Sequence, residues 1–199
     1  MHLPKVTGRS LNNGDMTIEK KSIEKEVLGL VVDKGKDPKE NFLLAKTFLD
    51  QLNEEYPELH FSKSDFIEAF NPERTNRQAV TYAAQAGGKI IGVLMGEEIS
   101  GAEEEVNDVK KLLRGQSFII NPRFQNTNVA RSLMEQVQRD YTDIIMTPVP
   151  LGGKEYLAGE DFSEDKRHAR QEALRRYYKK LGFEDRDRSS SMYWKKKEI

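Results

Sequence analysis

Two helix-forming segments on either side of a short apolar run constrain the possible fold of this chain more than any other feature. The first is a turn that opens onto an amphipathic helix, residues 121–134, and the second is a tyrosine-bearing helix that ends at a glycine, residues 173–183. The apolar run between them, residues 143–148, has the length of a strand. Turns before helices and Leu-Gly-Phe helix exits are each common in α/β proteins. A functional prediction therefore depends on the order and spacing of the three segments.

The turn before the first helix is suited to bind phosphate. The first N–H groups of a helix have no intrahelical partner, and the helix dipole places a partial positive charge at the same end. Both features favour a pyrophosphate group. Apolar residues fall on one side of residues 129–141, so this segment predicts a helix that packs on a core.

These segments resemble the GNAT superfamily of acyl-CoA-dependent N-acetyltransferases. The phosphate loop of that family runs Gln/Arg-x-x-Gly-x-Gly/Ala after a central strand, and residues 125–130 read Gln-Asn-Thr-Asn-Val-Ala. The apolar residues 117–122 match the preceding strand, which ends in proline, and residues 174–183 match a later segment with an aromatic-Tyr pair and Lys/Arg-x-Gly-Phe. Asn128 stands where the family prefers its first glycine, and asparagine is among the few other residues that tolerate a left-handed backbone.

The resemblance implies a fold and a co-substrate. It implies one α/β domain over residues 1–199, with a mixed, mostly antiparallel sheet flanked by helices and a splayed central pair of strands. The best match covers residues 78–194, and residues 1–20 are expected to be irregular. The pantetheine arm of acetyl-CoA would enter the gap between the splayed strands, and backbone N–H groups of the turn would receive the pyrophosphate. The residues assigned to this co-substrate are Phe118, Ile119, Ile120, Arg123, Gln125, Asn126, Thr127, Asn128, Val129, Ala130 and Arg131.

Two arginines flank the turn, Arg123 and Arg131. A guanidinium group matches the geometry of a phosphate, so both are candidates to pair with the ribose phosphate or the pyrophosphate. The sequence is equally consistent with two solvated arginines.

Acetyl transfer to an amine requires a neutral nucleophile and benefits from a proton donor for the departing thiolate. By its match to the family's tyrosine, Tyr178 is the candidate general acid. Adjacent helix residues point about 100° apart, so Tyr177 and Tyr178 can hardly both face the thioester. One of the two is expected to face the thioester, with Tyr178 favoured over Tyr177, and the other to pack in the core.

The general base is open in the sequence. Some family members use a glutamate on the central strand, but this strand offers only Gln116 and Ser117. Glu97 and Glu98, at the end of a predicted hairpin, are candidates to reach the acceptor directly or through water, and His168 is a third. Exposed glutamates and a lone helix histidine are usually structural or solvated.

Composition excludes several other kinds of site. The chain has no cysteine, which removes disulfides and thiolate chemistry, and its three histidines have no zinc-ligand spacing, so no metal is expected. The net charge of −1 gives no reason to expect a nucleic-acid partner. No apolar run approaches the roughly 20 residues that span a bilayer, and the N-terminus lacks a signal-peptide pattern. We therefore expect a cytoplasmic protein with no membrane contact.

The remaining patterns predict local structure. Residues 26–33 are either a strand or the start of a helix, and residues 97–108 are an acidic loop or frayed helix, more typical of a solvated face than of a site. Residues 148–165 form a long Pro- and Gly-containing connection, of the kind that is either functional or disordered. The other predicted elements are helices at 41–56 and 66–70, a hairpin of residues 78–85 and 89–95, and a closing strand at 190–196.

We therefore expect an enzyme that transfers the acetyl group of acetyl-CoA to a primary amine on a small molecule or a protein. The acidic stretch after the hairpin favours a cationic amine if it borders the acceptor. One alternative is a catalytically silent acyl-CoA-binding domain that acts as a sensor or interaction module. Another is a nucleotide or phosphate binder that shares only the turn and the helix. The sequence is compatible with a monomer or a homodimer.

Overall fold

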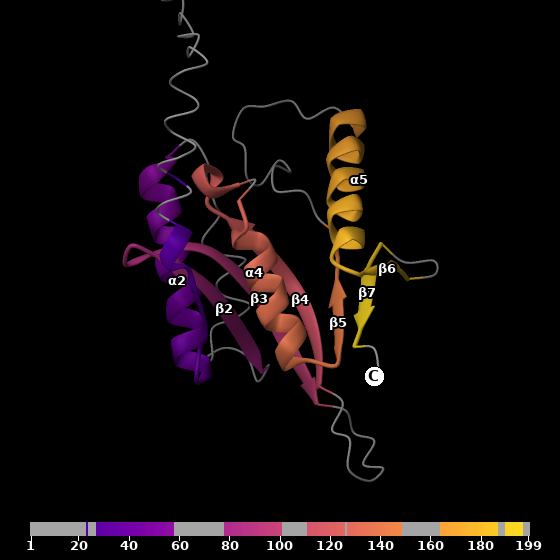
Figure 1. Ribbon diagram of the computed structural model, residues 1–199, viewed down its shortest axis with the longest axis horizontal. Coiled ribbons are helices and arrows are strands. Elements are labelled where there is room, and N and C mark those ends of the chain that lie inside the picture. The colour runs from indigo at the N-terminus through magenta and orange to yellow at the C-terminus, as the bar shows by residue number, and fades with distance from the viewer. Residues whose placement is uncertain are drawn as a thin grey trace, which may run out of the picture.

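A computed structural model describes residues 23, 27–57, 78–100, 111–125, 127–148, 164–186 and 190–196. Its centre is a 7-stranded sheet with the strand order β1-β2-β3-β4-β5-β7-β6 (Figure 1). The strands are β1 (Val31–Lys34), β2 (Ala79–Ala86), β3 (Lys89–Ser100), β4 (Lys111–Ile120), β5 (Asp143–Met146), β6 (Glu184–Asp185) and β7 (Met192–Lys195). Only β4 and β5 pair in parallel, and every other neighbouring pair is antiparallel. The mixed, mostly antiparallel sheet expected from the sequence is confirmed.

Helices cover both faces of this sheet. The helical elements of the described residues are η1 (Val27–Gly29), α2 (Pro38–Glu55), η2 (Pro122–Phe124), α4 (Val129–Asp140) and α5 (Glu164–Lys180). Successive side chains of a strand point to opposite faces, and β2 divides accordingly. Ala83 belongs to a buried cluster with Phe48 of α2, whereas Tyr82 belongs to another cluster with Leu133 of α4 and Tyr178 of α5. The sheet therefore separates an α2-side core from an α4-side core.

Helix α2 begins earlier than its apolar spacing predicts. The Asp37 side chain accepts a hydrogen bond from the Glu40 N–H at 2.8 Å, and Pro38 occupies the first turn, where its missing N–H costs nothing. The buried Asn41 then joins the helix to β2: its side-chain amide donates to the Ala79 carbonyl at 3.0 Å, and its oxygen accepts from the Thr81 N–H at 2.7 Å. One side chain thus fixes α2 against the sheet.

The predicted hairpin is confirmed, and its second strand is longer than expected. Gly87 and Gly88 both have positive φ, 57° and 77°, which a two-residue turn of this hand requires. Strand β3 continues to Ser100, so Glu97 and Glu98 pair with β4 instead of lying in an acidic loop or frayed helix. That prediction was wrong for residues 97–100, because strand pairing with residues 111–114 overrides the local charge pattern.

The remaining secondary-structure predictions are confirmed in part. Residues 26–33 contain a short 3-10 helix followed by the first residues of β1, and the closing strand is present as β7. The two-residue strand β6 was not predicted. The expected irregular residues 1–20, the short helix at 66–70, and most of the long connection after residue 148 lie outside the described residues. None of the described helices is long and apolar enough to cross a membrane.

Candidate acetyl-CoA site

Strands β4 and β5 diverge halfway along β4. Their parallel pairing ends with Gly115 opposite Met146, whereas β3 continues to pair with β4 as far as Ile120. Within the described residues, no strand pairs with the β5 side of residues 116–120. We call this divergence the fork. It corresponds to the splayed central pair that the resemblance implied, and it leaves backbone N–H and C=O groups of β4 available to a ligand.

A bulge in β4 lies at the base of the fork. Met95 of β3 pairs with Ser117 and Gly96 pairs with Gly115, so Gln116 is an extra residue with no partner in the register. A bulge bends its strand and increases the local twist, which here coincides with the point where β4 leaves β5. This bulge was not predictable from the sequence, because Gln116 carries no local turn or bulge signal.

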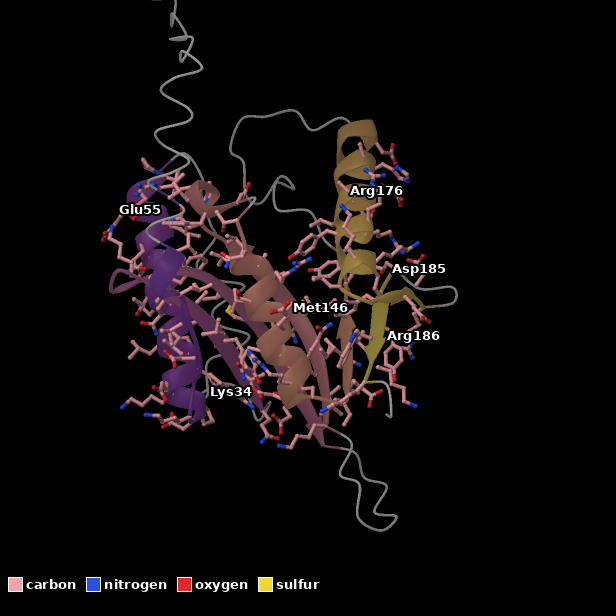
Figure 2. The ribbon with its side chains drawn as sticks, viewed as in Figure 1. Lys34, Glu55, Met146, Arg176, Asp185 and Arg186 are labelled. Carbon is pink, nitrogen blue, oxygen red and sulfur yellow. The ribbon has the colours of Figure 1, made fainter. Side chains whose placement is uncertain are left out.

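Met146 fills the space over Gly115 at the same point. A Cβ atom at Gly115 would lie 1.9 Å from the Met146 Sδ atom and 2.9 Å from its Cε atom. The Met146 side chain is buried, and it lies between α4 and α5 in the view of Figure 2. Only glycine leaves room for this methionine, so the two residues together shape the base of the fork.

The segment from residue 121 to residue 130 connects the end of β4 to α4. Asn121 accepts a hydrogen bond from the Arg123 N–H at 3.0 Å, and the Thr127 hydroxyl donates to the Phe124 carbonyl at 2.6 Å. Asn128 has φ −78° and ψ −4°, a right-handed conformation. The prediction that this position has a left-handed backbone is therefore wrong. Asparagine replaces glycine there without backbone strain. Asn126 lies outside the described residues.

The start of α4 is open toward a ligand. The Asn128 side chain forms no capping hydrogen bond, and the first turn of the helix contains no acidic residue. Among the described residues, no acceptor binds the N–H groups of Asn128, Ala130 or Arg131, and the Val129 N–H has only a long contact of 3.4 Å with the Thr127 hydroxyl. Unsatisfied donors and an uncompensated helix dipole together favour an anion.

A polar clamp holds the beginning of this connection. Asn121 is buried, and its amide donates to the Glu55 carboxylate at 2.7 Å, while its oxygen accepts from the Tyr56 hydroxyl at 3.2 Å. Lys89, at the hairpin, pairs with the same carboxylate at 3.1 Å. The Asn121 hydrogen bond, opposed in part by burial and supported by Lys89, lowers the pKa of Glu55. This clamp was not predictable from the local sequence, because its partners lie more than 30 residues apart along the chain.

Tyr178 reaches the fork from α5. Its ring is 4% exposed and lies 6.4 Å, centroid to centroid, from Phe118 on the diverging part of β4. Gly182, with φ 87°, ends α5 in a motif in which the Phe183 N–H donates to the Tyr178 carbonyl at 3.1 Å and the Gly182 N–H donates to the Lys179 carbonyl at 3.0 Å. The Phe183 ring then lies 5.4 Å from the Tyr178 ring. Burial raises the pKa of Tyr178, so its hydroxyl stays protonated.

Tyr177 faces α4 instead. Its hydroxyl is buried, and among the described residues it has no hydrogen-bond partner. Burial raises the pKa of Tyr177, the positive charge of Arg131 on the first turn of α4 acts in the opposite direction, and Glu135 adds to the increase. The structure thus separates the two tyrosines as the helix geometry required, with Tyr178 against the fork residue Phe118.

The structure does not bring Glu98 to the fork. The Glu98 carboxylate accepts from the Tyr141 hydroxyl at 2.8 Å and pairs with Lys34 at 3.4 Å. Glu98 lies opposite Leu113, where β4 and β5 are still paired, and its partner Lys34 lies at the other end of the sheet from Glu55 in Figure 2.

The two other candidate bases lie elsewhere. Glu97 is half-buried and pairs with Arg114, one position from Gly115 at the base of the fork. Because side chains alternate along β3, Glu97 points toward the face that α2 covers. His168 is exposed on the first half of α5.

The arginines that flank the turn are both exposed. The Arg123 guanidinium lies 5.6 Å from the centroid of the Phe124 ring, and Arg131 occupies the first turn of α4. Gln125 is exposed as well, whereas Val129 is buried in the α4-side core. Of the residues assigned to the turn, Arg123, Gln125 and Arg131 therefore have exposed side chains that can move toward a phosphate.

An open, polar cavity of about 330 Å³ lies on another side of α4. It is bordered by η1, β1 and the side of α4 that carries Ser132 and Arg139, and it reaches the phosphate turn only at Asn128. None of its lining residues belongs to β4, β5 or α5. The cavity is therefore distinct from the fork.

Comparison with known proteins gives matches in structure only. An aminoglycoside acetyltransferase from an uncultured soil metagenomic sample is similar over 80% of this chain and 94% of its own, with 16% identity and a TM-score of 0.47. A predicted acetyltransferase from Clostridium acetobutylicum, solved with acetyl-CoA, covers 80% and 93%, with 19% identity and a TM-score of 0.44. The PaiA N-acetyltransferase from Thermoplasma acidophilum, in complex with coenzyme A, covers 85% and 100%, with 10% identity and a TM-score of 0.45. These similar structures are GNAT acetyltransferases. Neither a protein-family model nor a curated protein sequence matches the chain.

Proposed function

We propose that this protein binds acetyl-CoA in the fork between β4 and β5 and transfers the acetyl group to a primary amine of a small molecule or a protein. One observation carries the proposal: the free edge of β4, the open start of α4 and the Tyr178 ring meet around a single segment, residues 116–131. Each of the three groups suits a different part of acetyl-CoA.

The chain's own groups support the proposal for two parts of the co-substrate, the pantetheine arm and the pyrophosphate. The amides of the pantetheine arm resemble a peptide backbone, so the free edge of residues 116–120 can bind them as it would bind a neighbouring strand. The N–H groups of Asn128, Ala130 and Arg131 have no acceptor among the described residues and suit a pyrophosphate, and the guanidinium of Arg131, in the same turn, could add a charge-assisted hydrogen bond. Acetyl-CoA itself supplies an activated acyl group.

The proposed chemistry places Tyr178 at the departing sulfur. The amine nitrogen forms a bond to the thioester carbon, the carbon–sulfur bond breaks, and the thiolate takes a proton. Tyr178 suits the role of donor because burial keeps its hydroxyl protonated and its ring contacts Phe118 on the fork. For the proton of the amine, we favour Glu97 over Glu98, since Glu97 pairs with Arg114, next to the base of the fork, and Glu98 pairs one position farther from it.

The burial of Tyr178 favours a second candidate function. A buried tyrosine whose ring packs against Phe118 and Phe183 suits a domain that binds acyl-CoA without turning it over. Binding of coenzyme A together with the absence of turnover on a panel of small-molecule and peptide amines would select this alternative.

Bulk at the phosphate turn tests the binding site. Ala130 is half-buried in the first turn of α4, and a tryptophan there would occupy the space in front of the free N–H groups, so Ala130→Trp should abolish coenzyme A binding measured by calorimetry. Arg139→Trp, on an exposed position in the last turn of the same helix, is the matched control and should bind like the wild type. Unchanged affinity in a folded Ala130→Trp variant would refute the site.

A further inference from the structure

The Tyr177 hydroxyl is the feature that the proposed chemistry leaves unused. It is buried, and among the described residues it forms no hydrogen bond, although its neighbour Tyr178 already occupies the fork. A buried hydroxyl without a partner destabilises the folded protein, so such a group is expected to serve a purpose. Packing does not supply one, because a phenylalanine ring would fill the same space without the penalty.

The surroundings of Tyr177 indicate what it would bind. The residue lies in the last turns of α5 and packs on the α4-side core, and its ring lies 5.9 Å from the Tyr178 ring. The charged groups that act on it belong to α4: Arg131 and Glu135. Arg131 is in the turn of α4 that presents the free N–H groups, and Glu135 lies one turn farther along the helix.

The chemistry of the hydroxyl selects an acceptor. Burial raises the pKa of Tyr177, which keeps the phenol neutral and able to donate a hydrogen bond. A donor beside a guanidinium and a helix start is complementary to an anionic oxygen.

We propose that Tyr177 is a cofactor-binding residue whose hydroxyl donates a hydrogen bond to a pyrophosphate oxygen of coenzyme A at the start of α4. This inference rests on the proposed function. It assigns the adjacent tyrosines to two tasks: Tyr177 holds the phosphates, and Tyr178 acts at the sulfur. Their divergence around the helix lets adjacent residues of α5 serve different parts of coenzyme A.

The test replaces only the hydroxyl. Tyr177→Phe should lower the affinity for coenzyme A about tenfold, as expected for one lost hydrogen bond, while the melting temperature of the ligand-free protein stays equal or rises, because an unsatisfied group has been removed. Tyr141→Phe, which removes a hydroxyl at the opposite end of α4 from the phosphate turn, is the matched control and should leave the affinity within about twofold of the wild type. Calorimetry measures the affinity, and differential scanning calorimetry measures the stability.

Adenosine 3′-phosphate 5′-diphosphate, which keeps the pyrophosphate and lacks the pantetheine arm, is the second ligand. The Tyr177→Phe loss should persist with it, and a loss seen with coenzyme A alone would overturn the assignment to the pyrophosphate. A Tyr177→Phe protein of lower stability and unchanged affinity would show a structural hydroxyl and overturn the inference outright. Failure of the proposed function looks different, since the wild type itself would then bind neither ligand.

Discussion

Replacing Gly115 with alanine tests whether Met146 sets the shape of the fork. The new Cβ atom would lie 1.9 Å from the Met146 Sδ atom, and a normal contact is about 3.5–4.0 Å, so the sulfur must move by roughly 2 Å. Met146 is 2% exposed, so it has to repack within the core. Overpacking of this kind costs about 1–3 kcal/mol, which for a chain of this size lowers Tm by roughly 2–12 °C.

A double-mutant cycle measures the coupling free energy between positions 115 and 146. Met146→Ala alone should cost about 2–5 kcal/mol, because it leaves a cavity in the α4-side core. In the double variant the alanine at 115 occupies part of that cavity, so the loss should fall short of the sum of the single losses by at least about 1 kcal/mol.

Urea unfolding of the four proteins gives the coupling free energy. Gly29→Ala is the matched control, because a Cβ atom there meets nothing within 4 Å, and its stability should not fall. Losses that add within about 0.5 kcal/mol would show that Gly115 and Met146 act independently, and the reasoning about the base of the fork would be refuted.

Two further predictions concern α2 and catalysis. Asn41→Ala should lower the free energy of unfolding in urea by about 2–4 kcal/mol, because the Ala79 carbonyl and the Thr81 N–H both lose their buried partner; a loss below about 0.5 kcal/mol would mean that water replaces the side chain. Tyr178→Phe should lower turnover at least about tenfold in a steady-state assay of coenzyme A release, and an unchanged kcat would remove Tyr178 from the proton-transfer role.

Local sequence signals predicted those elements that depend on local structure. The Gly87-Gly88 pair requires positive φ values that few other residues adopt, so the hairpin was readable from the sequence. The apolar spacing of residues 129–141 predicted α4, and Gly182 marked the end of α5. In each case the backbone conformation follows from residues within one or two turns.

The fork and its polar neighbours depend on long-range pairing. Nothing local in residues 97 and 98 separates a solvated loop from a strand, and β3 extends through them because β4 pairs alongside. Glu98 was a candidate base from its position after the hairpin, yet its partner Tyr141 is 43 residues away in the chain. The residue type at 128 was equally misleading, since asparagine suits both a left-handed turn and the right-handed position it occupies before α4.

The sheet divides the interior into two cores, and this division has a consequence for which amino-acid substitutions the protein can tolerate. Phe118, Met146, Tyr178 and the start of α4 all belong to the α4-side core, whereas α2 packs through a separate set of side chains. Substitutions that share no partners have nearly additive effects on stability. Sequence drift on the α2 face can therefore accumulate, and alter what that face recognises, as long as it spares Ile119 and the clamp on Asn121, where that face meets the fork and the phosphate turn.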